Sequence, residues 1–184
     1  RSIARDLAME TGGTFVLLDD VRPMARVILP RKEGVLGQSP QKHVDVCSFS
    51  GDITEDLANR DFTIDAMALS LSNSWSLEKS RTGLGVGASD KEYIIDPFGG
   101  LIDLADGVVR AVSNNCFKID PARLLRSVRL AAQMGFSISL ETYQMVKRDS
   151  YMIVEVAPER IRDELLKTLA ARECSRSLRL MDEL

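Results

Sequence analysis

The sequence has little cysteine and almost no histidine. Cys47, Cys116 and Cys174 are widely spaced with no C-x-x-C pair, and His43 is the single histidine. An odd number of scattered cysteines argues against a disulfide framework and is typical of reduced thiols in an intracellular protein. Without a second histidine or paired cysteines beside it, His43 gives no indication of a zinc site.

Long apolar runs are also missing, no signal peptide is visible in the sequence, and neither sign of charge dominates. No apolar run approaches the roughly 20 residues of a membrane-spanning helix, so we expect no membrane association. The net charge is -3 with 28% charged residues, and a site for a polyanion would therefore depend on a local basic patch. At 184 residues, 45% of them hydrophobic, the chain can form one ordinary domain or two small ones.

Strand and helix patterns divide the chain into two parts. Helical spacing over residues 2–10 precedes β-rich and mixed segments, which lie at 14–18, 24–29, 43–49, 93–95, 101–105 and 108–112. From Asp120 onward the pattern is helical, with helix starts near Pro121, Ser139 and Pro158. We therefore predict an α+β fold, with a mixed or antiparallel sheet and helices in residues 1–116 and an all-helical domain in residues 117–184.

Between these patterns, residues 72–91 are rich in serine, asparagine and glycine, and they include the string Gly83-x-Gly85-x-Gly87. Such strings can cradle phosphate when they join a strand to a helix. Here no predicted strand precedes the string and no helix start follows it. The pattern favours a flexible insertion.

The stretch Asn59–Met67 carries the first group of candidate site residues. If it is helical, Asp61 and Asp65 stand one turn apart on one face with Arg60 beside them. The apolar residues would then bury on a neighbouring face, at Phe62, Ala66 and Leu69. Polar groups anchored to a core in this way suit a ligand site. Taken alone, however, the stretch is better explained as an ordinary amphipathic helix with a charged first turn.

Asp120 begins a second group, because Arg123, Arg126 and Arg129 follow it at intervals of three. A positive helix N-terminus and arginine forks suit phosphates or the edge of a base. The alternative is a solvated basic stripe, which such spacing often gives.

Two weaker candidates come from the α/β part. Asp96, Gly100 and Asp103 place two carboxylates around a glycine turn, which simple turn chemistry also explains. Asp45 lies mid-strand between two valines, where burial is costly unless the carboxylate is paired or binds a metal. Alternatively, the Asp45 side of the strand faces water, and the carboxylate then needs neither a partner nor a metal. This alternative is slightly favoured.

The order of these motifs resembles class II nucleotidyltransferases, the family of tRNA CCA-adding enzymes and bacterial-type poly(A) polymerases. The similarity extends from about Gly12 to Leu169 and rests on four collinear segments, namely Asn59–Met67, Asp96–Leu104, Asp120–Arg126 and Glu159–Leu166. It implies a polymerase-beta-like head domain whose N-terminal part is missing, followed by a helical neck.

The resemblance also implies roles for the candidate residues. Nucleotide binding falls to Arg60, Asp61, Asp65, Asp120, Arg123 and Arg126, with Asp120 and Arg123 reading the base of ATP or CTP. Head and neck would be coupled through Asp96, Gly100 and Asp103, and Asp45 falls where a third catalytic carboxylate can occur. In the implied reaction an RNA 3′-hydroxyl attacks the α-phosphate and pyrophosphate leaves, while Mg²⁺ neutralises charge.

Three departures from the family pattern affect these expectations. The metal-holding Asp-x-Asp pair after a Gly-Gly turn is absent, and the chain begins at Arg1 without methionine, so we expect the main metal ligands upstream and an inactive fragment. Ile119 stands where the family usually has glutamate. Asp65 replaces an asparagine, which exchanges an amide donor for an acceptor-only group and should weaken nucleotide binding.

The sequence therefore predicts part of an RNA 3′-end nucleotidyltransferase. We favour tRNA 3′ ends over poly(A) tails as its acceptor. The alternative is a non-catalytic RNA- or nucleotide-binding module derived from the same fold. Cytoplasm is the default compartment, and a plastid or mitochondrion stays open.

Overall fold

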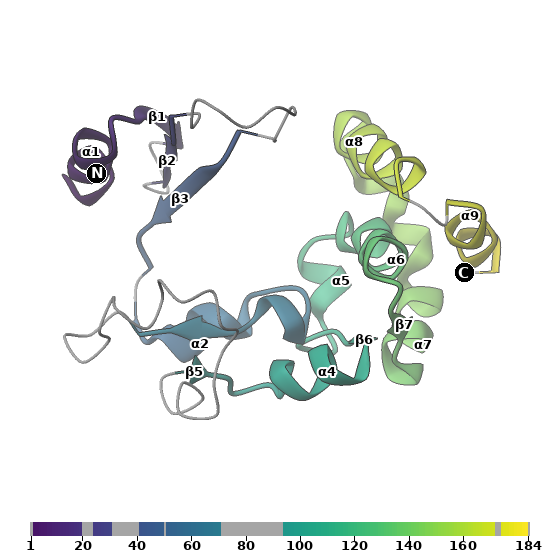
Figure 1. Cartoon of the computed structure of the whole chain (residues 1–184). Coiled ribbons are helices and arrows are strands. Elements are labelled where there is room, and N and C mark those ends of the chain that lie inside the picture. The colour runs from purple at the N-terminus through teal and green to yellow at the C-terminus, as the bar shows by residue number, and fades with distance from the viewer. Residues whose placement is uncertain are drawn as a thin grey trace. The chain divides into compact units, whose positions relative to one another are not determined.

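The structure is a computed structural model that describes residues 2–19, 24–30, 41–49, 51–70, 94–171 and 174–183. The chain forms two compact units, Arg1–Gly51 and Asp52–Leu184 (Figure 1). The glycine-rich insertion predicted at 72–91 lies outside the described residues. No helix in the described ranges is long and apolar enough to cross a membrane.

The first unit packs one helix on a small antiparallel sheet. Its elements are α1 (Ser2–Thr11), β1 (Thr14–Asp19), β2 (Met24–Ile28) and β3 (His43–Cys47), with β2 in the middle of the sheet. The core is built from small side chains, chiefly Ala4, Ala8, Ala25 and Val27, which let the helix approach the strands closely. The helix and the strands predicted for this region are confirmed.

The second unit begins with short elements. These are α2 (Ile53–Ala58), the 3₁₀ turn η1 (Thr63–Asp65), β4 (Ala68–Leu69), β5 (Ile94–Ile95), α4 (Gly100–Asp106) and β6 (Val108–Val109). Strand β4 pairs antiparallel with β5, and β6 pairs parallel with β7 (Ser137–Ile138).

The helix considered for Asn59–Met67 does not form, and that prediction is wrong. Phe62 has extended dihedral angles, φ -124° and ψ 150°, and forms an isolated antiparallel bridge with Ala111. Only Thr63–Asp65 is coiled, as a single 3₁₀ turn. Phe62 and Ala66 are nevertheless fully buried, whereas Leu69 is 41% exposed. Pairing with a distant segment has overridden the local helical pattern.

Helices make up most of the remaining chain. They are α5 (Cys116–Ile119), α6 (Arg123–Met134), α7 (Leu140–Asp149), the 3₁₀ segment η3 (Ser150–Glu155), α8 (Pro158–Leu169) and α9 (Cys174–Glu183). The predicted starts of α7 and α8 are confirmed, and the Ser139 side chain caps α7 by accepting from Thr142 N. Helix α6 begins two residues later than predicted, because the Asp120 carboxylate accepts from Ala122 N within a turn. The sequence reading missed α5 and α9.

One hydrophobic core joins distant described segments of the second unit. Phe62, Ile64 and Val109 pack with apolar residues that lie further along the chain, among them Phe117, Leu124, Leu130, Met145 and Val146. Residues on both sides of the predicted 116/117 boundary therefore share one core. The contacts divide the chain after Gly51 instead, and the head–neck boundary stays a prediction.

Candidate functional site

Most of the predicted nucleotide-binding residues surround one hollow of about 380 Å³ in the second unit. The predicted residues in its wall are Arg60, Asp61, Asp120, Arg123 and Arg126. Ala122, which was not predicted, lines it as well. Helix α8 supplies the rest, namely Arg160, Asp163, Glu164 and Lys167. The volume lies within the range of small-molecule sites. Five cationic and four acidic side chains line it, so the hollow is strongly polar and nearly balanced in charge.

Backbone pairing brings the wall of the hollow together. The carbonyl oxygen of Asp61 accepts from Val112 N at 3.0 Å and from Cys116 Sγ at 3.2 Å. Arg123, at the start of α6, donates from Nη2 to Asn59 O at 2.7 Å and from Nη1 to Cys116 O at 3.3 Å. Two segments about 60 residues apart in the sequence are thereby held edge to edge.

Arg123 differs from the other arginines of the hollow. Its described hydrogen bonds go to two carbonyl oxygens and to the thiol sulfur of Cys116, and within the described residues it forms no ion pair. A guanidinium has five N–H donors in a planar fork. Arg123 is therefore fixed in place while its charge is not neutralised by a contacting carboxylate.

Arg126 lies between two carboxylates. Its Nε is 2.5 Å from Asp61 Oδ2, and its Nη2 is 3.2 Å from Asp65 Oδ2. The Nε contact is an ion pair without hydrogen-bond alignment, since this buried nitrogen has no partner of acceptable geometry. Asp61 and Asp65 thus contact the same arginine. The sequence predicted that the two carboxylates lie on one face, but no helix places them there. Asp65 is half exposed and is not part of the wall of the hollow.

Asp120 is held by Arg160 of helix α8. Arg160 Nη1 donates to Asp120 Oδ1 at 2.9 Å, and Nη2 donates to Oδ2 at 2.8 Å. This two-pronged pair lowers the pKa of the Asp120 carboxyl below its usual range. Asp120 is therefore ionised at neutral pH and can only accept hydrogen bonds.

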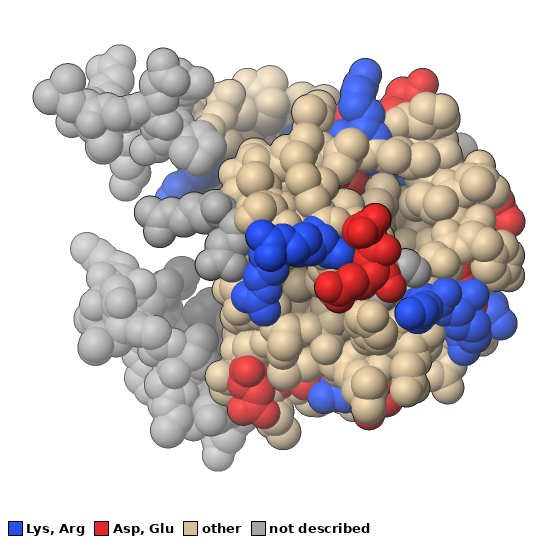
Figure 2. Space-filling view, turned by 90° about the vertical axis from the view of Figure 1, so that its right-hand side faces the viewer, with Lys and Arg blue, Asp and Glu red and all other residues tan. Residues whose placement is uncertain are grey.

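Sequence reasoning missed the contribution of helix α8. Besides Arg160, this helix presents Glu164, which contacts Arg129 Nε at 2.5 Å and Lys167 Nζ at 3.1 Å. The available signal was the motif Glu159–Leu166, in which Arg160 and Glu164 stand at i and i+4 on one face. Figure 2 shows that cationic and acidic side chains lie beside one another in small groups on the visible face.

The predicted coupling residues lie on a chain of contacts through α4. Asp96 accepts from Gly100 N at 2.7 Å and from Leu101 N at 2.9 Å at the start of that helix. Asp103 is buried and accepts from Thr63 Oγ1 at 2.7 Å and from Arg110 Nε at 3.1 Å. Arg110 also reaches Glu141 of α7, at 3.2 Å. The contacts link η1, α4 and α7, and the coupling role itself stays a prediction.

Asp45 lies in the first unit, where it pairs with Arg26 on the neighbouring strand. Two hydrogen bonds of 2.7 and 2.8 Å join the side chains, and they lower the pKa of the Asp45 carboxyl. The carboxylate is partly exposed and paired, and its pairing with Arg26 outweighs the small cost of burial. The proposed catalytic use of Asp45 stays a prediction.

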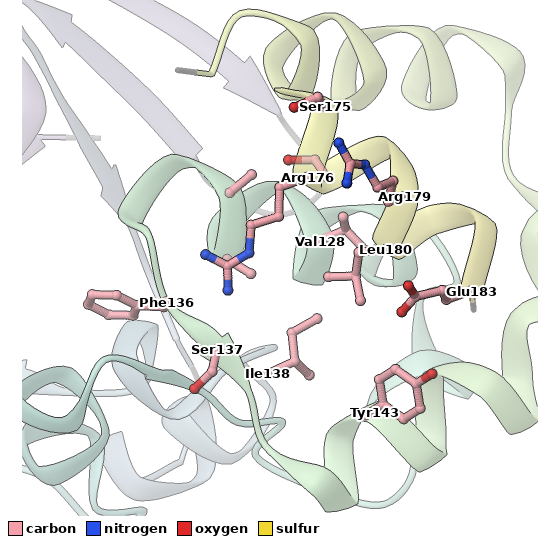
Figure 3. Close-up of a pocket in the computed structure, with 13 residues that line it drawn as sticks. Val128, Phe136, Ser137, Ile138, Tyr143, Ser175, Arg176, Arg179, Leu180 and Glu183 are labelled. Atoms are coloured by element: carbon pink, nitrogen blue, oxygen red, sulfur yellow. The ribbon is translucent and has the colours of Figure 1, made fainter. Parts of the chain in front are cut away.

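A larger hollow, of about 530 Å³, lies between α9 and the elements α6, β7 and α7 (Figure 3). Val128, Ile138 and Leu180 form part of its apolar lining, while Arg176 and Arg179 come from α9. None of the predicted site residues lines it. The smaller hollow is therefore the candidate site.

The described residues contain no group of three or more His, Cys, Asp or Glu side chains that could hold a metal ion. The four acidic residues in the wall of the candidate site contact arginines instead, as does Asp65 outside the wall. The four are Asp61, Asp120, Asp163 and Glu164.

Comparison with protein families finds two matches along the chain. Residues 31–110 match the poly(A) polymerase head domain, and residues 135–184 match the probable RNA- and SrmB-binding site of polymerase A. The CC-adding tRNA nucleotidyltransferase of Geobacter sulfurreducens is 36% identical over 167 residues, which are 91% of this chain and 33% of that protein. Poly(A) polymerase I of Escherichia coli O157:H7 is 34% identical over 123 residues, which are 66% of this chain and 23% of that protein.

Solved structures give the same picture. A CCA-adding enzyme in complex with ATP aligns with a TM-score of 0.74 and 28% identity, over 99% of this chain and 39% of that one. The Thermotoga maritima CCA-adding enzyme complexed with tRNA aligns with a TM-score of 0.73 and 28% identity, again over 99% and 39%. The predicted α+β class is confirmed. The chain spans about a third of the length of the curated relatives named CC- or CCA-adding.

Proposed function

This chain belongs to the class II nucleotidyltransferase family of tRNA CCA-adding enzymes and bacterial-type poly(A) polymerases, and from that premise we propose that it forms the nucleotide-recognition part of an RNA 3′-end nucleotidyltransferase. The observation that carries the proposal is the convergence of Asp120, Arg123 and Arg126 on one polar hollow. ATP and CTP are the proposed substrates, and a tRNA 3′ end is the proposed acceptor. Similarity to CCA-adding enzymes solved with ATP, CTP and tRNA supports both assignments.

Asp120 and Arg123 have complementary chemistry for reading a base. The ionised Asp120 carboxylate accepts hydrogen bonds, and it can pair with the exocyclic amino group that adenine and cytosine share. The Arg123 guanidinium donates hydrogen bonds and can pair with the ring nitrogen acceptor beside that amino group. Guanine and uracil present a carbonyl oxygen and a ring N–H at these positions, so the same pair would reject them.

Arg126 and Arg60 are the proposed phosphate ligands, since both line the hollow with Arg123. Arginine forks bind phosphate oxygens through two parallel hydrogen bonds. Arg126 must exchange part of its contact with Asp61 and Asp65 for this purpose. The triphosphate therefore competes with two carboxylates of the chain itself.

The described residues do not fit the Mg²⁺ ion that the family resemblance implies. They contain no cluster of three metal-ligating side chains, and the acids of the hollow contact arginines. In these enzymes the ion would supply charge neutralisation at the phosphates. The roles proposed for this chain therefore concern nucleotide recognition, and we expect the 184-residue chain alone to incorporate neither CTP nor ATP.

Nucleotide binding by the purified chain tests the proposal. Dissociation constants for ATP, CTP, GTP and UTP are measured by titration calorimetry for the wild type, for Arg123→Ala and for the control Arg162→Ala. Arg162 lies on α8 with an exposed side chain that pairs with Asp163. We expect the wild type and the control to prefer ATP and CTP. Arg123→Ala should lose about tenfold or more of that preference, since a hydrogen bond to a charged group contributes about 1.5–3 kcal/mol.

Equal binding of all four nucleotides by the wild type, or selectivity that persists without Arg123, would contradict the base-reading role. The alternative function, a non-catalytic RNA- or nucleotide-binding module, has the same hollow and predicts the same binding. The upstream coding sequence separates the two. An Asp-x-Asp pair after a Gly-Gly turn supports the enzyme, and its absence supports the binding module.

A further inference from the structure

Arg160 is the basic side chain of α8 that reaches the predicted base-reading pair. Its two terminal nitrogens donate to the two oxygens of Asp120, at 2.9 and 2.8 Å. The Arg160 side chain is 56% exposed, while the Asp120 side chain is 29% exposed. The pair therefore lies at the edge of the hollow, with Asp120 on the inner side.

This contact determines how the Asp120 carboxylate is oriented. A carboxylate turns readily about its last carbon–carbon bond, and that torsion has broad preferences. A planar guanidinium that binds both oxygens fixes the plane of the group. The remaining hydrogen bond to the carboxylate, from Ala122 N to Oδ1, is longer at 3.2 Å and holds a single oxygen. Arg160 is thus the principal restraint on the direction of the acceptor lone pairs.

Helix α8 does not need Arg160 in order to stay on α6. A second pair, Arg129 with Glu164, joins the same two helices one turn further along α8 at 2.5 Å. Both of its side chains are nearly buried, at 12% and 13% exposed. The hydrogen bond from Gln133 Nε2 to Lys167 O continues the contact. The two charge pairs therefore have separable effects, one on packing and the other on Asp120.

We propose that Arg160 is a positioning residue for nucleotide selection, which holds the Asp120 carboxylate in the orientation that accepts the amino group of adenine or cytosine. The proposal rests on the proposed function, because it assigns Asp120 to base reading. Loss of Arg160 should leave triphosphate affinity largely intact, since the proposed phosphate ligands Arg60 and Arg126 are untouched. It should, however, allow the carboxylate to turn and lose its preference among bases.

The test compares Arg160→Gln with the wild type for ATP, CTP, GTP and UTP, and the measured quantity is the ratio of dissociation constants between disfavoured and favoured nucleotides. We expect that ratio to fall by about tenfold, which corresponds to about 1.4 kcal/mol. Arg160→Lys keeps the charge but cannot form the planar two-pronged pair that fixes the carboxylate plane, and it should recover only part of the ratio. It also serves as the second variant if glutamine impairs folding.

Two controls separate positioning from a general loosening of the helices. Arg129→Gln removes the buried α6–α8 pair, so it should lower the melting temperature and leave the ratio unchanged. Arg162→Gln removes an exposed arginine of the same helix and should change neither quantity.

Each outcome bears on a specific claim. If the wild type shows no preference among nucleotides, the proposed function fails and the role of Arg160 fails with it. If the wild type is selective and Arg160→Gln is equally selective, the positioning role is wrong while the proposed function stands. Tighter binding by Arg160→Gln would show that Arg160 competes with the nucleotide for Asp120, and loss of selectivity in Arg129→Gln would show a structural effect. Either result overturns the proposal.

Discussion

Substitution of Gly100 tests how closely α4 packs against η1 in the second unit. It is the first residue of α4 and lies directly against η1. A methyl group at this position would overlap the carbonyl oxygen of Thr63 and would come within 2.9 Å of Met67 Cγ. The carbonyl belongs to the backbone, so no side-chain rotation can relieve the overlap. In Gly100→Ala, helix α4 must therefore move away from η1.

The cost of that movement follows from the contacts it strains. Overpacking of a well-fitted interior costs about 1–3 kcal/mol. The shift also lengthens the buried hydrogen bond from Thr63 Oγ1 to Asp103 Oδ2, now 2.7 Å, and a hydrogen bond to a charged group contributes about 1.5–3 kcal/mol. Alanine regains up to about 1 kcal/mol in helix propensity. We expect a net loss of about 3 kcal/mol, or a melting temperature lower by roughly 6–12 °C.

Thermal unfolding followed by circular dichroism measures this loss, and Gly135→Ala is the matched control. Gly135 ends α6 with φ +69°, and no heavy atom lies within 4 Å of a methyl group placed there. Its substitution therefore costs only the left-handed strain, about 1–2 kcal/mol. A Gly100→Ala variant that is no less stable than Gly135→Ala would refute the close-packing argument.

Three further predictions concern charge and the thiols. Asp65→Asn removes one of the two carboxylates on the proposed phosphate-binding arginine, so triphosphate should bind up to about fivefold tighter; unchanged or weaker binding in calorimetry would contradict this. Burial raises the pKa of the Cys116 thiol to about 11, so iodoacetamide should alkylate this residue only after denaturation. The exposed Cys47 should react in the native protein, and peptide mass spectrometry measures the alkylation of each residue. The lowered pKa of Asp120 stabilises the fold above its unfolded-state pKa of about 3.9, and this contribution is lost as pH falls through the folded-state pKa. The stability deficit of Arg160→Gln should therefore be full at pH 7 and narrow below about pH 4, and a deficit independent of pH would argue against the pair.

Local pattern was sufficient for the elements whose partners are close in sequence. The strands predicted at 14–18, 24–29 and 43–49 follow one another along the chain. They form β1, β2 and β3, which are neighbours in one small sheet. Capping signals at Ser139 and Pro158 likewise placed the starts of α7 and α8. In these cases the residues that determine the structure lie within a few positions of the element itself.

Asn59–Met67 shows where local pattern fails. Phe62, Ala66 and the two aspartates have spacings that a helix would use, yet the segment is extended at Phe62 because that residue bridges Ala111. The energy that decides its conformation comes from burial of the Phe62 ring and from bonds to residues about 50 positions away. No window of the sequence around the segment contains those partners.

The candidate site depends on long-range contacts to a still greater degree. Arg123 reaches Asn59 O across 64 positions, and Arg160 reaches Asp120 across 40. Residue types and spacing alone left each motif with an ordinary structural explanation, and the collinear family resemblance supplied the expectation that they meet. It included Arg160 only as part of the Glu159–Leu166 motif and gave it no role, because the contact of that side chain with Asp120 is visible only once α8 lies on α6. If Asp120 reads the base as we propose, this carboxylate does not depend on its own motif alone. Its orientation is determined by a second helix, and changes in the packing of α8 should therefore alter nucleotide choice without any change to the residues that touch the base.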